Sequence, residues 1–466
     1  MKILCGYNVN IDSVYRISGT ELSELLESFE SAEILDKIEN PPGRIESVSD
    51  FVAGLAYCMK NGCGAEWLVF QRSVFEFLKE RYFEKSLVRM GGNAGIMANA
   101  LSEIGASLVV PNVAVPSKAQ LSLFSGKNMY FPNNVLPSSG PESPGGGNTA
   151  EAAFPDQDPI HFVFDFSGGD SFSLYGTRVT VPRENRFIAT CDQLNFRLFT
   201  SPAFEAYALR HAGEIDGALI SGFHLLLETY PDGSSYEKLL DNALARLRAW
   251  KGANEKLRIH LEFGHFGSRE IARTVFLRFA GISYSMGMNE DELAVFHDLH
   301  GVPPEGIRRM EAESVGKAAS GLASGPGLRK LLVHTREFVL SAVAVDPGRV
   351  EAPALLQEAE KELEALEFGV RCAGVYAATG RLDGREFVEN KSEKLEESVF
   401  GGEQLSRFLD AFGGQAFRRG AFALYGGYML CMLPTLLSKS PVTTVGLGDT
   451  LTSGTFLRRL ELDVQV

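Results

Sequence analysis

The chain has 466 residues, roughly three times the ~150 residues typical of one domain, so it is either one large α/β unit or a core with a second lobe. Hydrophobic residues make up 45% and charged residues 22%, which supplies a sizeable core and excludes a disordered or fibrous chain. The formal net charge of −14 argues against nucleic acid as a partner, so any anionic substrate would have to be bound by a few placed cations.

The six cysteines are scattered, without a CxxC pair or a Cys/His spacing typical of zinc. Reduced thiols and a cytoplasmic location are therefore expected. The apolar run at the start of the chain is too short for a signal peptide. One uncharged run, residues 420–438, approaches transmembrane length but contains Gly426-Gly427 and Pro434, so a buried helix is favoured over a membrane span.

The first elements alternate between strand and helix. Residues 2–7 predict a short buried strand, and three polar side chains follow it, at Asn8, Asn10 and Asp12. Apolar residues spaced three and four apart predict one amphipathic helix over 21–38. Strand ends in open α/β sheets are where ligands bind, so the polar residues after the first strand are candidates for a site.

The middle of the chain has a different character. A helix is expected over 94–104, and residues 116–159 are rich in Pro, Ser, Gly and Asn, which predicts a loop-rich insertion. Residues 161–166 and 186–189 then look like strands. A small β-rich lobe is the economical interpretation of this region.

From residue 203 onward, short apolar runs alternate with longer helical stretches such as 236–250. The expected strands are 217–222, 258–262, 331–334 and 442–446. This alternation predicts an α/β fold with a doubly wound, mostly parallel sheet and helices on both faces. The expected large domain comprises 1–16, 88–115 and 203–466, and the small lobe with its connections comprises 17–87 and 116–202.

A glycine-rich segment near the end of the chain carries the strongest chemical signal. Gly446, Gly448 and Asp449 lie between the expected strand 442–446 and a helix. Free N–H groups at a helix start can face an anion, and the glycines allow a close approach of that anion. Asp449 would then accept a proton from an attacking hydroxyl. The alternative is that Asp449 is only a helix cap in an ordinary turn.

Two acidic motifs precede this segment. Asn289 and Glu292 would share a helix face and could hold a hydrated magnesium ion, although acids also occur in the first turn of ordinary helices. His260 and Glu262 lie at the end of an expected strand and point to the same side. Taken alone, the second pair would be structural rather than a metal site.

Two further groups could bind a substrate. Amides, carboxylates and glycine backbone suit a polyhydroxylated ligand, and they occur at Asn10, Asp12, Gly91, Gly92 and Asn93. Taken alone, either segment is more often a plain turn than a site. Three cations lie close together in sequence and could clamp a phosphate, or could face solvent: Arg183, Arg186 and Arg197.

In this order, the motifs NxNxD, GGNA, HLE, NEDE and VGLGDT resemble those of the ADP-dependent sugar kinases, the archaeal-type phosphofructokinases and glucokinases of the ribokinase-like superfamily. The resemblance implies a large α/β domain with a small β-rich lid that closes over the sugar. It also implies a cytoplasmic enzyme of a modified glycolytic pathway, a monomer or small homo-oligomer, that uses ADP and Mg²⁺.

The resemblance also implies a role for each motif. Asp449 matches the catalytic base, while Gly446 and Gly448 match the anion hole of the transferred phosphoryl group. The implied metal residues are Glu262, Asn289, Glu292 and Asp449, and the implied nucleotide residues are His260, Arg197 and Gly448. The implied sugar residues are Asn10, Asp12, Gly91, Gly92 and Asn93; Asn93 stands where glucokinase-like members commonly have glutamine.

The acceptor is a choice between two sugars. Fructose 6-phosphate needs cations, which Arg183, Arg186 and Arg197 supply, whereas glucose brings only hydroxyls, which Glu66 could bind. The favoured interpretation is an ADP-dependent phosphofructokinase that forms fructose 1,6-bisphosphate and AMP, with glucokinase activity as a second activity. The alternatives are an ADP-dependent glucokinase, an ATP-dependent relative and a catalytically silent sugar or nucleotide sensor.

Overall fold

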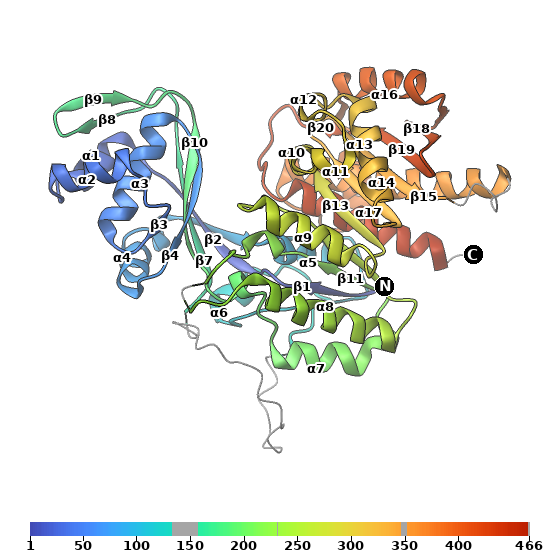
Figure 1. Cartoon of the computed structure of the whole chain (residues 1–466), viewed down its shortest axis with the longest axis horizontal. Coiled ribbons are helices and arrows are strands. Elements are labelled where there is room, and N and C mark those ends of the chain that lie inside the picture. Colours follow the sequence, from blue (N-terminus) through green and yellow to red (C-terminus); the bar gives the residue numbers. More distant parts are fainter. Residues whose placement is uncertain (133–156, 231, 346–351, 465–466) are drawn as a thin grey trace, which may run out of the picture.

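The computed structural model describes residues 1–132, 157–230, 232–345 and 352–464. Its elements form two lobes of unequal size, each built on its own sheet (Figure 1). Part of the expected loop-rich insertion, residues 133–156, lies outside the described residues.

The larger sheet has ten strands in the order β17-β18-β19-β15-β14-β13-β12-β11-β1-β6. Six of them run parallel: β1 (Lys2–Gly6), β6 (Leu108–Pro111), β11 (Gly217–Ile220), β12 (Arg258–Glu262), β13 (Ser285–Asn289) and β14 (Lys330–His334). An antiparallel extension completes it: β15 (Phe338–Ala344), β17 (Gln415–Phe417), β18 (Gly420–Tyr425) and β19 (Tyr428–Pro434). The sheet is therefore mixed, with a parallel half that forms the candidate site.

Helices cover both faces of this sheet, as the alternation of strands and helices predicts. One face packs against α7 (Pro202–His211), α8 (Tyr236–Ala253), α9 (Arg269–Phe279), α13 (Ala312–Ser324) and α16 (Val399–Phe412). The other packs against α5 (Asn93–Glu103), α14 (Ala352–Thr379) and α17 (Leu447–Val464). Strand β1 shows the period of two: Leu4 faces the first group of helices, whereas Ile3 and Cys5 face the second.

The smaller sheet has the order β3-β4-β10-β7-β2-β5. Its strands are β3 (Arg44–Ile45), β4 (Ala65–Val69), β10 (Asn185–Cys191), β7 (Ile160–Phe166), β2 (Asn10–Arg16) and β5 (Leu87–Gly91). One face packs against α1 (Gly19–Leu26), α2 (Ser31–Glu39), α3 (Val48–Asn61) and α4 (Arg72–Tyr82), with Phe51 against Phe164 and Phe187. We call this lobe the lid, and the opposite face of its sheet the open face.

The lid draws on more of the chain than the sequence analysis assigned to it. Strands β2 and β5 belong to its sheet, although residues 10–16 and 88–91 were expected in the large domain. The reason is tertiary: β2 pairs with β7, a strand about 150 residues further along the chain, and no local pattern specifies such a partner. A hairpin of β8 (Ser171–Leu174) and β9 (Thr177–Thr180) packs on α1.

Three local predictions are wrong. The helix expected over 21–38 is two helices, α1 and α2. The run 420–438 is the hairpin β18-β19 rather than a helix, because Gly426 and Gly427 take positive φ angles of 59° and 82° and make the turn. The strand expected over 442–446 is a loop. No helix in the described parts of the chain is long and apolar enough to span a membrane.

Short elements complete the described chain. They are α6 (Lys118–Leu121), α10 (Glu290–Val295), α11 (His297–His300), α12 (Pro304–Arg308), α15 (Arg385–Ser392), β16 (Glu396–Glu397) and β20 (Leu436–Leu437).

Candidate active site

The carboxyl ends of the parallel strands and the start of α17 meet at one edge of the larger sheet. Asp449 lies in the first turn of α17 and is buried. The Asn93 amide, at the start of α5, donates to Asp449 Oδ1 at 2.8 Å, and the Asn8 amide donates to Asn93 Oδ1 at 3.2 Å. Burial, with a smaller contribution from nearby Glu262, raises the pKa of Asp449 to about 7. A carboxyl group with this pKa can exchange a proton near neutrality.

The two glycines before Asp449 are required by geometry. Gly446 has a φ of +76°, which favours glycine, and a Cβ there would lie 2.9 Å from the Ile96 side chain. A Cβ on Gly448 would lie 2.7 Å from the His334 ring. The backbone of 446–449 is therefore held close to its neighbours, at the end of the helix where N–H groups have no intrahelical acceptor.

A buried charge network stands beside this helix start. Glu262 shares hydrogen bonds of 2.8 Å with both His260 and His334, and the Thr452 hydroxyl donates to it at 3.0 Å. Burial opposes ionisation of Glu262, but the two histidines outweigh it and lower its pKa to about 2. Burial also opposes the charge on His334, yet the bond to Glu262 raises its pKa to about 9. Glu262 and His334 therefore form a charged pair at neutral pH.

Sequence reasoning missed His334. It is the last residue of the strand expected over 331–334, and it lies at the same sheet edge as Glu262. The rule that ligands bind at strand carboxyl ends was the signal that could have identified it.

The Asn289 and Glu292 motif forms a capping box at the start of α10. Asn289 Oδ1 accepts from the Glu292 N–H at 2.8 Å, and Glu292 Oε2 accepts from the Asn289 N–H at 2.9 Å. The helix-start interpretation is thus the one that the structure displays. Burial raises the pKa of Glu292 to about 7, with contributions from Glu262 and Asp449, so the three carboxylates share one low-dielectric region.

The side chains around Asp449 offer oxygen atoms to a metal ion. Within the described residues, no three His, Cys, Asp or Glu side chains are arranged to ligate a cation directly. Oxygen donors of carboxylates nevertheless suit Mg²⁺, which keeps several waters. Burial raises the pKa values of Glu292 and Asp449, and repulsion from Glu262 adds to both increases; a cation would relieve that repulsion. The residues therefore fit a hydrated ion that contacts them through water.

A row of polar side chains crosses the open face of the lid. Cross-strand pairing aligns Arg89 on β5, Asp12 on β2, His161 on β7 and Thr190 on β10. The Thr190 hydroxyl donates to Glu66 Oε1 on β4 at 2.7 Å, which extends the row across five strands. Such a row offers both donors and acceptors to a ligand between the lobes.

The acidic centre of this row is tightly packed. The Asn10 amide donates to Asp12 Oδ1 at 2.9 Å, and a Cβ on Gly91 would collide with both side chains. Burial raises the pKa of Asp12, although His161 and Arg89 oppose that increase. A Cβ on Gly92, which has a φ of +74°, would lie 2.6 Å from the Asn10 side chain. Both glycines are therefore sites of close approach.

His161 was also missed by sequence reasoning. Burial opposes its charge, but a hydrogen bond of 3.2 Å to buried Asp192, together with the nearby carboxylates of Glu66 and Asp12, outweighs burial and raises the pKa of His161 to about 9. The alternation of side chains along this strand could have identified it. Phe162 and Phe164 face the lid core, so His161 faces the opposite side of the sheet.

The three arginines do not form one clamp. Arg183 donates to the Gly62 carbonyl at 2.7 Å. Arg186 lies 3.6 Å from Asp165 and is 42% exposed. Arg197 pairs with Asp232 at 2.9 Å and stacks over the Tyr230 ring at 4.3 Å. They are close in sequence, but a turn, a strand and a 3₁₀ helix point them in different directions.

A family model, the ADP-specific Phosphofructokinase/Glucokinase conserved region, matches residues 1–458. The chain belongs to this family. Similar members include the ADP-specific phosphofructokinase of Thermococcus zilligii, 26% identical over 99% of this chain and 96% of its own. The ADP-dependent glucose/glucosamine kinase of Pyrococcus abyssi is 25% identical over 99% and 94%. The family resemblance seen in the sequence is thereby confirmed.

Solved structures confirm the fold of this family member. The hypothetical ADP-dependent phosphofructokinase of Pyrococcus horikoshii OT3 superimposes with a TM-score of 0.80 at 24% identity, covering 100% of this chain and 99% of that one. A phosphofructokinase from the same organism with AMP gives 0.79 at 24% identity, with the same coverage.

Proposed function

We propose that this protein is an ADP-dependent phosphofructokinase. It transfers the β-phosphoryl group of Mg-ADP to the 1-hydroxyl of fructose 6-phosphate, forming fructose 1,6-bisphosphate and AMP. The observation that carries the proposal is the placement of Asp449. Its buried carboxylate lies at the start of α17, in a family whose curated members are named as ADP-dependent kinases.

The chain's own residues account for the chemistry. Asp449 accepts the proton of the attacking hydroxyl, while Asn93 holds its carboxylate in place. The N–H groups of residues 446–448 face the transferred phosphoryl group, and Arg197 neutralises charge on it. Glu262, Glu292, Asn289 and Asp449 would hold Mg²⁺ through waters. The bound ion supplies positive charge to the nucleotide phosphates.

The lid supports a sugar between the lobes. Asn10, Asp12, Gly91 and Gly92 lie at the end of the polar row nearest Asn93, where hydroxyl groups need both donors and acceptors. Of the three arginines, Arg186 is the one available to a sugar phosphate, because it is partly exposed and only loosely paired with Asp165. A lid that closes on the sugar excludes water, which protects ADP from hydrolysis.

ADP-dependent glucokinase activity is the second candidate. Glu66 favours it, because this carboxylate is 42% exposed on the open face beside Thr190 and can accept from a sugar hydroxyl. Magnesium dependence, a cytoplasmic location and a monomeric or small homo-oligomeric state belong to the same proposal.

A matrix of ADP and ATP against glucose and fructose 6-phosphate tests the proposal. AMP release and phosphate transfer should be fastest with ADP and fructose 6-phosphate. A faster reaction with glucose would replace the first candidate by the second, and ATP use would overturn the donor assignment. A sugar or nucleotide sensor would release no AMP with any pair.

Glu66→Ala sharpens the choice of acceptor. We expect kcat/KM for glucose to fall about tenfold, because a hydrogen bond to a charged group is lost, with a smaller loss on fructose 6-phosphate. Glu24→Ala, an exposed carboxylate on α1 of the same lobe, is the matched control and should leave both values unchanged. An equal loss on both sugars would show that Glu66 does not discriminate between them.

A further inference from the structure

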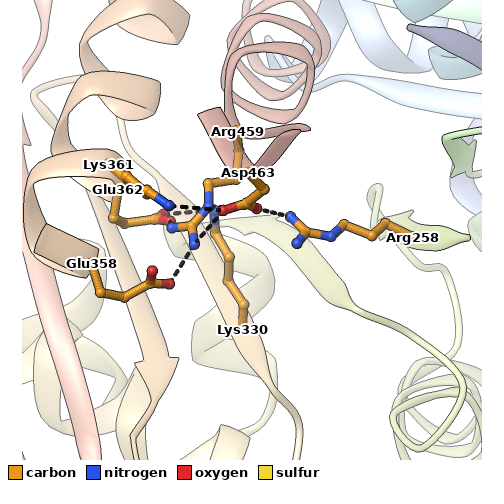
Figure 2. Close-up of polar contacts among 7 residues, drawn as sticks. All are labelled: Arg258, Lys330, Glu358, Lys361, Glu362, Arg459 and Asp463. Atoms are coloured by element: carbon orange, nitrogen blue, oxygen red, sulfur yellow. Dashed lines mark hydrogen bonds and ion pairs between the residues drawn. The ribbon is translucent and has the colours of Figure 1, made fainter. Parts of the chain in front are cut away.

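A second buried ion network lies away from the active-site edge, around Arg459 near the end of α17 (Figure 2). Its guanidinium bonds Glu362 at 3.0 Å and Asp463 at 3.1 Å, and also contacts Glu358. Lys330 Nζ lies 2.6 Å from Glu362 Oε1. Glu362 is fully buried, and Lys330 and Arg459 are each only 4% exposed.

The network joins four elements of the larger lobe. Glu358 and Glu362 lie on α14, and Lys330 is the first residue of β14. Asp463 extends the network by pairing with Arg258, the first residue of β12. The ion pairs thus connect α17 to α14 and to the amino ends of two parallel strands.

Three of these elements carry an active-site group at their other end. The pairs that share an element are Arg258 and Glu262 on β12, Lys330 and His334 on β14, and Arg459 and Asp449 on α17. Each strand spans about 13 Å between its two residues, and the helix spans about 15 Å. These short regular elements are stiff, so a shift at the Arg459 end moves the active-site end as well.

Stability does not by itself account for such a network. Removing charges from water costs several kcal/mol per ion, and replacing a buried ion cluster with apolar residues of similar volume is often neutral or stabilising. Ion pairs do, however, specify one geometry, because guanidinium and carboxylate groups bond only in particular directions. Register between elements is therefore the property that the network supplies.

We propose that Lys330, Glu362 and Arg459 are positioning residues, which hold β12, β14 and α17 in the one register that places Asp449 beside the Glu262–His334 pair. The inference rests on the proposed kinase function. None of the three touches a group that reacts in that function. They act by fixing the distance between the base and the charged pair.

The test is the triple variant K330M/E362L/R459M, which replaces the buried ions with apolar side chains of comparable volume. We expect a folded protein in which kcat falls roughly tenfold to a hundredfold, because displacements near 1 Å have such effects. KM for ADP should change little, because the nucleotide contacts themselves remain. A merely structural cluster would instead lower the unfolding temperature and leave kcat of the folded enzyme intact.

A matched control lies on the same helix. Arg385 on α15 pairs with Glu461 on α17 through two bonds, one of 3.0 Å, and also donates to the Ile104 carbonyl at the end of α5; none of these contacts involves β12 or β14. The variant R385M/E461L should keep the parent kcat, whatever it does to thermal stability. A loss in the control equal to that in the triple variant would overturn the proposal.

If the triple variant does not fold, a second measurement on the milder variant E358Q/D463N tests the proposal instead. It leaves Glu362 and Lys330 in place but weakens two partners of Arg459. Amide hydrogen exchange should become faster at 260–262, 332–334 and 447–452 than in R385M/E461L, together with a smaller loss of kcat.

The outcomes separate the two proposals. If the parent releases AMP and the folded network variants keep both its kcat and its exchange rates, the positioning role is overturned and the kinase assignment stands. If the parent releases no AMP, the kinase assignment fails. Faster exchange at the three segments would then still support the register role, and unchanged exchange would overturn it.

Discussion

The active-site edge of the larger sheet and the open face of the lid use charge differently. At the edge, Asp449 and Glu262 are buried and bonded to partners from other elements, Asn93 and His334. On the lid, Arg186 is partly exposed, and its neighbour Asp165 comes from the adjacent strand of the same sheet. The charged groups at the sheet edge already have their bonding partners. On the lid, by contrast, Arg186 is only loosely paired.

This difference separates catalysis from substrate choice. Preorganised groups stabilise a transition state without rearrangement, so the chemistry should depend on the sheet edge. Exposed ion pairs contribute little to stability and can exchange partners, so Arg186 can pair with a substrate phosphate instead of Asp165. Three predictions test this division.

The largest effect is expected at the sheet edge. Asp449→Asn should lower kcat by ~10²–10⁴, because an amide cannot accept the hydroxyl proton. Steady-state kinetics with ADP and fructose 6-phosphate measure the loss, and thermal unfolding confirms that the variant folds. Near-parental turnover in the folded variant would show that Asp449 is not the base.

An intermediate effect is expected on the lid. Arg186→Ala should raise KM for fructose 6-phosphate about tenfold, because one hydrogen bond between charged groups is lost. KM for glucose should stay unchanged, because glucose carries no phosphate. Arg183→Ala is the control, because its side chain is already bonded to the Gly62 carbonyl and should not affect either sugar. An equal increase in KM for fructose 6-phosphate in both variants would show that Arg186 has no special role in binding the sugar phosphate.

The smallest effect is expected in the dependence of the unfolding temperature on pH. The pKa of His334 is raised to about 9 in the folded protein, so its pairing with Glu262 stabilises the fold below the ordinary histidine pKa of about 6.5. That stabilisation is lost as pH rises through about 9. Between pH 7 and 9 the unfolding temperature of the parent should therefore fall by roughly a few degrees more than that of Glu262→Gln. His161, whose pKa is also about 9, is present in both proteins and cancels in the comparison. If the unfolding temperature fell equally with pH in both proteins, the Glu262–His334 pair would not be charged.

The sequence predicted those parts of the site whose geometry is local. The glycines at 446 and 448, followed by Asp449 and a helix, specify a helix start within a few residues. The motif at 289–292 likewise specifies a capping box, because both partners lie within one turn.

Features made by distant segments were not predictable in this way. His334 became part of the site because β14 lies two strands from β12. Arg183, Arg186 and Arg197 looked like one cluster because they are close in sequence, but the lid directs them differently. Residues 420–438 are uncharged and mostly apolar, and such a run does not by itself distinguish a helix from a buried hairpin.

By itself, the sequence indicated the family through the resemblance of its motifs. It also determined the doubly wound plan and residues at helix and strand ends, because short-range patterns of apolar residues, glycines and caps specify these. Only the tertiary structure decided that β2 and β5 belong to the lid, that Glu262 pairs with His334, and that Arg459 connects the elements that carry the site. Each of these depends on contacts between segments tens to hundreds of residues apart. Such contacts form when burial brings the segments together, and local preference does not encode them.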